Sequence, residues 1–333
     1  MWLAHQQQRI GLGCMHLSRD DERALAVLCA AIDAGITVFD TARAYAIDDD
    51  DRGHSERLLA RAIALRPSAA PSLRVITKGG MQRPAGRWLV DGRARSLAAD
   101  CAASKAALGA VPIDLYLLHA PDPSVPLATS VRALASLLDK GHVKHIGLCN
   151  VNRAQLDEAL AIAPIGAVQV SLSWFDDRAL IGGVVERCLE RDIAVIAHTP
   201  LGGARRKSAV ARDRALQRVA AKHDASTHAV ALAALLDLDP RVLAIPGATT
   251  VATARDCASA SQITLDDDDR AILQRIPRAR ARKPRAPTLD PTREVVLLMG
   301  LQGAGKTDAL SSWLARGYER LNRDERGGTM KKL

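Results

Sequence analysis

Short apolar runs alternate with amphipathic stretches along the first 276 residues of the chain. Eight apolar runs have the length and residue types of buried strands: Arg9–Gly13, Ile36–Asp40, Leu73–Lys78, Ile113–His119, Val143–Cys149, Ala167–Ser171, Ile193–His198 and Val242–Pro246. The amphipathic stretches between them predict helices: Asp21–Gly35, Ser55–Leu65, Ala94–Gly109, Leu127–Gly141, Arg153–Ala163, Arg178–Asp192 and a longer one over Ala215–Leu238. Near-continuous apolar strands are typical of a parallel sheet covered on both faces, so the alternation predicts an α/β fold whose sheet is open or closed.

Polar residues at the ends of four successive strands favour the closed form. Asp40, Lys78 and His119 end their runs, and Asn150 directly follows the next one. In a closed barrel the carboxyl ends of all strands converge on one mouth, where active sites form. An open nucleotide-binding sheet would carry a Gly-rich turn before its first helix, but Gly11–Gly13 lacks the third glycine. The pattern therefore predicts a (β/α)8 TIM barrel over residues 1–276.

Composition places the chain among soluble globular proteins. It has 333 residues, of which 48% are hydrophobic and 25% charged, close to average usage. Neither a signal-peptide-like start nor a run of ~18 apolar residues is present, so no membrane span is expected. The six cysteines contain no C-x-x-C pair, and a core of this size needs no disulfides. We expect reduced, mostly buried thiols in a cytoplasmic protein.

The net charge of +9 raises the question of nucleic-acid binding. Much of it comes from one segment, residues 277–293, which also carries four prolines. Its charged residues are Arg278, Arg280, Arg282, Lys283, Arg285 and Arg293 against Asp290. A DNA-binding arm and a solvated linker both fit; the prolines favour an extended, solvated linker.

The strand-end residues have the types that carbonyl reduction needs. The developing alkoxide requires a proton donor, a group that tunes that donor, and a group that orients the carbonyl. Tyr45 lies five residues beyond Asp40, and a nearby ammonium such as Lys78 favours its phenolate and makes the hydroxyl a better donor. Taken singly, Asp40 could cap a turn, Lys78 could be a surface charge, and His119 could be a loop histidine. Their joint order at successive strand ends favours the catalytic interpretation.

Over residues 8–276 the sequence resembles the aldo-keto reductase family. The motifs that carry the resemblance are G-L-G at Gly11–Gly13, F-D-T-A-R-A-Y at Phe39–Tyr45, G-H-S-E-R-L-L from Gly53, T-K-G-G from Thr77, I-D-L-Y-L-L-H at Ile113–His119, G-H-V-K-H-I-G-L-C-N at Gly141–Asn150, T-P-L-G-G from Thr199 and I-P-G-A-T from Ile245. The resemblance implies that Tyr45 is the general acid, Lys78 and Asp40 tune it, and His119 orients a small-molecule carbonyl substrate. It also implies that the loop Gly79–Gly92, with Arg83, Arg87 and Trp88, forms a pocket wall.

The same resemblance implies an NADPH or NADH site. Asn150 and Gln169 match residues that hold the nicotinamide carboxamide; Thr199, Leu201 and Gly202 match the pyrophosphate stretch. Cys149 stands where a serine is common, and Leu172 stands where an aromatic often packs on the nicotinamide. After Ile245-Pro246 the usual cation for the 2′-phosphate is missing: Gly247 begins a segment without charge, and Arg255 is the next cation. NADPH is the family default, and NADH stays open.

A second motif follows the linker. Glu294–Met299 predicts a buried strand, followed by the phosphate-binding loop G-L-Q-G-A-G-K-T at Gly300–Thr307 and a helical pattern. Without side chains at Gly300, Gly303 and Gly305, backbone N–H groups would face the phosphates of ATP. Lys306 would neutralise the phosphates, and Thr307 would ligate Mg²⁺. Through Gly317-Tyr318 and Asn322–Asp324 this segment resembles the start of polynucleotide-kinase-like enzymes. We interpret residues 294–333 as the first fragment of a kinase domain, with nucleic acid as a partner only of a complete one.

The sequence therefore predicts an NAD(P)H-dependent carbonyl reductase. The alternative is an NAD(P)H-binding regulatory or scaffold barrel attached to the ATP-binding segment. Leu172 and Cys149 favour that alternative slightly, whereas the intact tetrad of Asp40, Tyr45, Lys78 and His119 argues against it.

Overall fold

A computed structural model of the chain describes Trp2, residues 8–17, 20–203 and 206–273, and Arg316. The chain divides into two units, residues 1–282 and 283–333, and the description below concerns the first. The predicted linker and the phosphate-binding loop Gly300–Thr307 lie outside the described residues.

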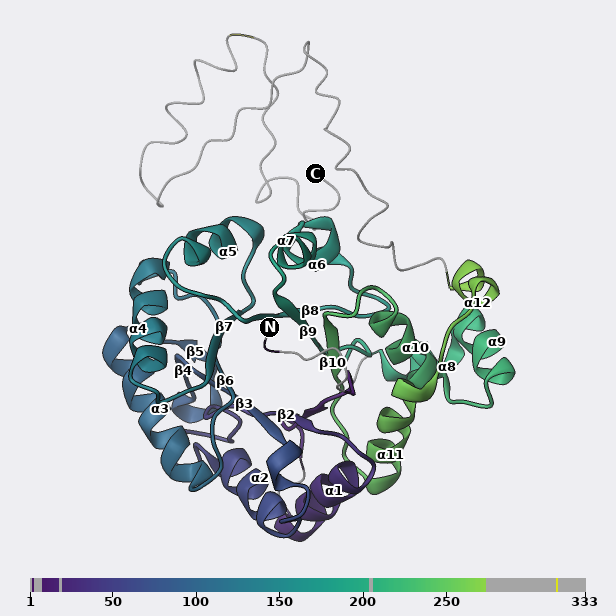
Figure 1. Ribbon diagram of the computed structural model, residues 1–333, viewed down its shortest axis with the longest axis horizontal. Coiled ribbons are helices and arrows are strands. Elements are labelled where there is room, and N and C mark those ends of the chain that lie inside the picture. Colours follow the sequence, from purple (N-terminus) through teal and green to yellow (C-terminus); the bar gives the residue numbers. More distant parts are fainter. Residues whose placement is uncertain (1, 3–7, 18–19, 204–205, 274–315, 317–333) are drawn as a thin grey trace. The chain divides into compact units, whose positions relative to one another are not determined.

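Eight parallel strands form one sheet in the order β1-β2-β3-β6-β7-β8-β9-β10. They are β1 (Leu12–Gly13), β2 (Val38–Asp40), β3 (Arg74–Gly79), β6 (Leu115–Leu118), β7 (His145–Cys149), β8 (Ala167–Ser171), β9 (Ala194–His198) and β10 (Val242–Ile245). The sheet closes where Ile10 and Gly13 pair in parallel with Ala244 and Gly247. The predicted (β/α)8 barrel is confirmed, and Figure 1 shows its helices arranged in a ring around the strands.

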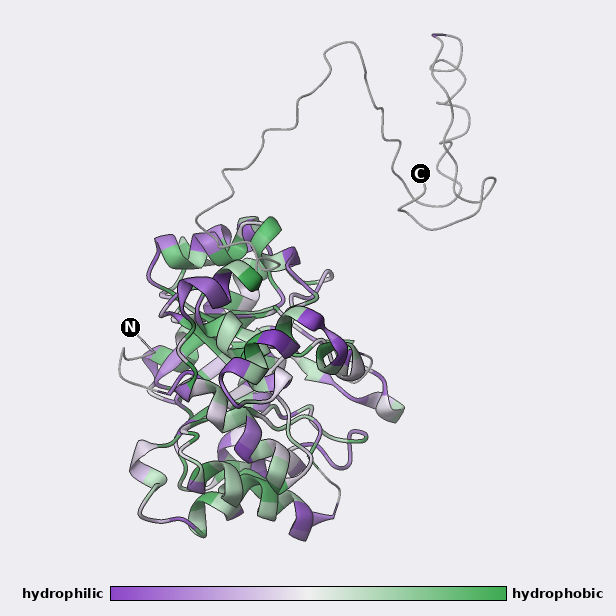
Figure 2. Cartoon of the chain, turned by 90° about the vertical axis from the view of Figure 1, so that its right-hand side faces the viewer, coloured by the Kyte–Doolittle hydropathy of each residue, from purple (hydrophilic) through white to green (hydrophobic). Residues whose placement is uncertain are grey.

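Helices follow the strands in chain order, some of them in the ring and others beside it (Figure 1). They are α1 (Asp21–Asp33), α2 (His54–Ala64), α3 (Ala94–Leu108), α4 (Leu127–Asp139), α5 (Arg153–Leu160), α6 (Arg178–Ile181), α7 (Val184–Glu190), α8 (Lys207–Arg212), α9 (Arg214–Lys222), α10 (Thr227–Leu236), α11 (Val251–Ser259) and α12 (Asp267–Ile272). Figure 2 shows hydrophilic and hydrophobic residues side by side along the helices. Within the described residues, no helix is long and apolar enough to cross a membrane. All six cysteines are free and buried.

Two predicted helices are broken in the structure. The stretch Ala215–Leu238 forms α9 and α10, separated at Asp224, whose φ of 47° is left-handed. The stretch Arg178–Asp192 forms α6 and α7, separated at Gly183 with φ of 72°. Amphipathic periodicity continues across both breaks, which is why the sequence predicts single helices.

Alternation along each strand separates the barrel interior from the layer under the helices. On β2, Val38 belongs to the inner apolar cluster, whereas Phe39 packs outward in the larger one. Trp2 is 2% exposed and belongs to the inner cluster with Val38, Leu115 and Ala167, so it fills the barrel near the starts of the strands. The same alternation aims the last residue of β2 and the penultimate residue of β3 into the opposite end, the mouth.

The loop after β3 carries a small hairpin that the sequence did not predict. Its strands, β4 (Met81–Gln82) and β5 (Leu89–Val90), pair antiparallel outside the barrel. The hairpin lies within the loop Gly79–Gly92, and it fixes the conformation of the predicted pocket wall.

Candidate active site

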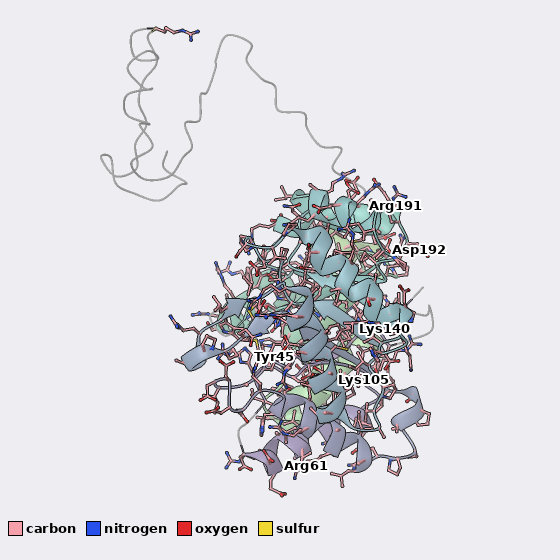
Figure 3. The ribbon with its side chains drawn as sticks, turned by 90° about the vertical axis from the view of Figure 1, so that its left-hand side faces the viewer. Tyr45, Arg61, Lys105, Lys140, Arg191 and Asp192 are labelled. Atoms are coloured by element: carbon pink, nitrogen blue, oxygen red, sulfur yellow. The ribbon has the colours of Figure 1, made fainter. Side chains whose placement is uncertain are left out.

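The mouth holds a buried ion pair between neighbouring strands. Lys78 Nζ lies 2.6 Å from Asp40 Oδ2, and the two side chains are 0% and 2% exposed. The ammonium also donates to the Thr41 carbonyl at 2.9 Å and to the Tyr45 hydroxyl oxygen at 2.9 Å. An ammonium has three N–H donors, so all three are used. Lys140 and Asp192 lie shortly before the starts of β7 and β9. Figure 3 shows Tyr45 at the opposite end of the barrel from these two residues.

This hydrogen bonding leaves the Tyr45 proton available. The phenol oxygen accepts from Lys78, and the nearest acceptor for its own O–H is Asp40 Oδ2 at 3.5 Å, which is long for a hydroxyl donor. A substrate oxygen at the mouth would be a better acceptor. The geometry therefore presents Tyr45 as a proton donor.

The pKa values of Tyr45 and Lys78 differ in part from what the sequence suggests, because burial acts on both groups. Burial raises the pKa of Tyr45 more than the nearby Lys78 ammonium lowers it, and the Asp40 carboxylate raises it further. Burial opposes the charge of Lys78, but Asp40, Tyr45 and Cys149 together outweigh burial and hold the pKa of the ammonium above its ordinary value. The Lys78 ammonium favours the phenolate, as the sequence suggests, but burial outweighs that effect. Tyr45 stays protonated and Lys78 stays charged across the neutral range.

His119 follows β6 and lies beside Tyr45. The two rings meet edge to face with centroids 5.8 Å apart. Burial first, and then Lys78 and His198, hold the pKa of the imidazole well below its usual range, so it is neutral and carries one N–H. Its Nδ1 is buried and lacks a hydrogen-bond partner among the described residues. A neutral donor beside the acid suits the orientation of a carbonyl oxygen.

Gln169 on β8 lies beneath the tetrad. Its Nε2 donates to Asp40 Oδ1 at 2.7 Å, and the residue is 3% exposed. Both Asp40 oxygens are therefore engaged, one by Lys78 and one by Gln169. A nicotinamide contact, as the resemblance implies, would have to use the remaining amide oxygen of Gln169.

Asn150 belongs to a chain of polar contacts at the rim. Its Nδ2 donates to the His119 carbonyl at 3.1 Å, and its Oδ1 lies 3.0 Å from His198 Nε2. His198 Nδ1 in turn lies 3.0 Å from Thr199 Oγ1. Asn150 and Thr199 both have left-handed backbones, with φ of 58° and 53°, conformations that cost energy and concentrate at functional sites.

His198 was not predicted from the sequence. It is the polar last residue of an apolar strand, the same signal that indicates His119, and burial lowers its pKa to about 4. Leu172 does not face the mouth as expected, because its side chain is 0% exposed and packs in the outer core. Alternation explains the error: with Gln169 facing inward, Leu172 three positions later faces outward. Cys149 does face inward, where burial raises the pKa of its thiol.

Residues after β9 and β10 expose backbone that could hold a phosphate group. Gly202 and Gly203 have φ of 78° and 73°, and a Cβ on Gly202 would lie 2.6 Å from the Arg206 Cβ. Gly247 is exposed beside Gly13 at the closure of the barrel. Bare backbone at these points lets N–H groups approach a phosphate closely. Leu201 is half-buried beside them.

Arg255 is exposed on α11 and lies close enough to Asp33 of α1 to contribute to the lowered pKa of that carboxyl, after the larger effect of Arg66. Thr250 caps α11 and forms a capping box with Thr253. The segment between Gly247 and the helix thus offers hydroxyls and backbone N–H groups to a cofactor ribose or phosphate, but no cation.

The pocket wall contains three stacked side chains. Trp88 meets His119 edge to face at 5.9 Å, and the Arg83 guanidinium lies 4.0 Å from the Trp88 ring centroid. Arg87 is exposed. The predicted wall at Gly79–Gly92 is therefore adjacent to the tetrad through Trp88. Within the described residues, no group of His, Cys, Asp and Glu side chains could hold a metal ion.

Comparison with known proteins agrees with this arrangement. The sequence profile described as the aldo/keto reductase family matches residues 9–278. A thermostable aldo-keto reductase solved with the inhibitor epalrestat is 28% identical, with a TM-score of 0.67 over 80% of this chain and 94% of that one. An aldo-keto reductase from Klebsiella pneumoniae in complex with NADPH is 24% identical, with a TM-score of 0.68 over 83% and 93%. A glycerol dehydrogenase from Gluconobacter oxydans is 24% identical, with a TM-score of 0.68 over 86% and 95%. The last two resemble this chain in fold.

Proposed function

Because the chain belongs to the aldo/keto reductase family, we propose that it is an oxidoreductase that reduces an aldehyde or ketone to an alcohol with NAD(P)H. The observation that carries the proposal is the Lys78 ammonium, bonded at once to Asp40 and to the Tyr45 oxygen. A buried ion pair is costly to keep. Its use here is to hold a phenol ready to lose and regain a proton.

Each member of the tetrad has one task in this reaction. When bound, the reduced nicotinamide supplies the hydrogen and the electron pair that the carbonyl carbon accepts. Tyr45 donates its proton to the carbonyl oxygen, and Lys78 stabilises the phenolate that remains. Neutral His119 donates its N–H to the same oxygen and orients it. Asp40, held by Gln169, keeps Lys78 in place.

The cofactor contacts are part of the proposal. Asn150 and the free amide oxygen of Gln169 hold the carboxamide, and Thr199, Leu201 and Gly202 line the pyrophosphate. The NADPH complex of the Klebsiella relative supports a nicotinamide cofactor. Gly247 leaves room for the adenosine end, and Arg255 is the next cation after it along the chain. One charged contact to a phosphate contributes about ten- to a hundred-fold, so without one we expect NADPH to be preferred over NADH by less than ~100-fold.

A carbonyl screen tests the proposal. Purified full-length protein is mixed with aliphatic, aromatic and sugar aldehydes and simple ketones, and the loss of NADPH or NADH absorbance is followed. Carbonyl-dependent oxidation of either cofactor supports the proposal. Binding of a cofactor without turnover of any carbonyl contradicts it and favours the second candidate.

The second candidate is a regulatory or scaffold barrel joined to an ATP-binding segment. The phosphate-binding loop Gly300–Thr307, with Lys306 and Thr307 for phosphate and Mg²⁺, favours it. We keep reduction as the main function because Lys78 bonds both Asp40 and Tyr45, and His119 lies beside Tyr45. The variant Lys306→Ala, which removes the cation of the phosphate-binding loop, should leave carbonyl reduction unchanged if the barrel acts independently of that segment.

A further inference from the structure

Arg83, in the pocket wall, has hydrogen-bond donors without acceptors. It is 9% exposed. Its Nη2 donates to the Ile47 carbonyl at 3.2 Å, while its Nε and Nη1 are buried and have no partner among the described residues. One N–H on Nε and two on Nη1 are therefore unused.

A buried guanidinium ordinarily has its in-plane donors satisfied. Arg9 in the same barrel shows the usual solution, since its Nη1 lies 2.7, 3.0 and 3.1 Å from three backbone carbonyls. Asp49, the carboxylate next to Arg83, accepts from the Arg83 backbone N–H and pairs with Arg52 instead. The charge of Arg83 thus lacks a carboxylate partner within the described part of the barrel.

The position of this charge connects it to the tetrad. Its guanidinium stacks on Trp88, Trp88 meets the ring of His119, and His119 meets the ring of Tyr45. Its one backbone acceptor belongs to Ile47, two residues beyond Tyr45. Stacking on Trp88 uses the face of the guanidinium and leaves its edges free. A purely structural role in holding the loop would explain the stacking but not the unused donors.

We propose that Arg83 binds a carboxylate of the carbonyl substrate, so that the preferred substrates are aldehydes or ketones bearing one carboxylate. The inference rests on the proposed reductase function and names its substrate class. A single free guanidinium neutralises a monoanion, whereas a phosphate monoester dianion would call for further cations. Trp88, which is 45% exposed, covers one face of the guanidinium and leaves its edges to the carboxylate.

A matched pair of substrates tests this. Para-carboxybenzaldehyde and its methyl ester share the ring and the aldehyde and differ in charge. We expect the wild-type enzyme to have the higher kcat/KM for the acid. Arg83→Met should lower kcat/KM for the acid by roughly ten- to a hundred-fold and change the ester by less than about threefold. Arg83→Lys, which keeps the charge without the planar fork, should retain part of the preference.

Arg95→Met is the control, because Arg95 is exposed on α3, outside the pocket wall, so its replacement should leave kcat/KM for both substrates unchanged. An equal fall for acid and ester in Arg83→Met, or no change in their ratio, overturns the inference and leaves the reductase function standing. If no carbonyl is turned over, the proposed function fails. Calorimetry with para-hydroxymethylbenzoate and its methyl ester then tests the anion site independently of turnover. Binding of the acid that Arg83→Met abolishes supports the site, and equal affinity for acid and ester overturns it.

Discussion

The two ends of the barrel interior have opposite chemistry, although the same strands build both. Near the strand starts, Trp2 packs among Val38, Leu115 and Ala167. At the mouth, the same strands carry an ion pair, a neutral imidazole and a phenol. Apolar packing at one end contributes stability, and at the other end stability is given up to hold charges away from water. Replacements at the two ends should therefore have different consequences for folding and for turnover.

The largest effect is expected for Lys78→Met. It removes the group that stabilises the Tyr45 phenolate and leaves Asp40 buried without its cation, so kcat should fall by about 10³-fold or more. The free energy of unfolding should fall by about 3–5 kcal/mol. Steady-state kinetics and denaturant melts measure the two.

The double variant Asp40→Asn/Lys78→Met separates the effect on stability from the effect on kcat, because it removes both charges. It should regain much of the stability and none of the activity. An active Lys78→Met enzyme, or a double variant as unstable as the single one, would contradict the assignment of the ion pair.

Trp2→Ala tests the apolar end of the barrel interior. Losing a large buried ring should cost about 3–5 kcal/mol of unfolding free energy, while kcat at a temperature where the variant is folded should change by less than about twofold. Thermal melts beside initial rates provide the comparison. A large loss of kcat in a folded Trp2→Ala variant would show that the two ends are coupled.

Gln169→Leu should have an intermediate effect. It removes the hydrogen bond from Gln169 to Asp40 Oδ1, and a bond to a charged group contributes about 1.5–3 kcal/mol, so we expect kcat to fall by about ten- to a hundred-fold. Fluorescence titration gives the cofactor Kd, whose change measures the second proposed role of Gln169, contact with the carboxamide. A variant with altered cofactor Kd and wild-type kcat would mean that Gln169 does not position Asp40.

The smallest effect is expected from pH. The pKa of His119 is well below its usual range and that of His198 is lowered to about 4, while the pKa values of Lys78 and Tyr45 are raised. No member of this set changes charge between about pH 5.5 and 9, so kcat/KM for reduction should be flat there. A bell-shaped profile centred near neutrality would contradict these shifts.

The same shifts have a consequence for stability. His198 has an ordinary pKa of 6.5 and a folded pKa of about 4, so the unfolded chain binds more protons between these values. Its contribution to stability is present above pH 6.5 and is lost as the pH falls through about 4.

Strand ends were the most predictable feature of this molecule. Buried parallel strands are continuous apolar runs, and a polar residue that ends one, such as Asp40 or Lys78, is conspicuous. The partners of those residues were less predictable. That Gln169 contacts Asp40 depends on barrel closure, since 129 positions separate them. The net effect on the Tyr45 pKa depends on burial, which sequence neighbours do not reveal.

Loop structure was the least predictable. The hairpin of β4 and β5 consists of two two-residue strands, too short for an alternation signal. The unused donors of Arg83 follow from where the hairpin folds and not from its composition.

The central claim is that Tyr45 is the proton donor, and removing its hydroxyl tests that most directly. Tyr116→Phe is the matched control, because Tyr116 is fully buried in the outer layer and its hydroxyl bonds the Leu97 carbonyl. Kinetics with the best carbonyl substrate and fluorescence titration of the cofactor are measured for both variants. We predict that Tyr45→Phe loses about 10³-fold or more in kcat while cofactor Kd stays within about twofold, and that Tyr116→Phe remains active. A Tyr45→Phe enzyme that keeps more than about a tenth of the wild-type kcat would contradict the account.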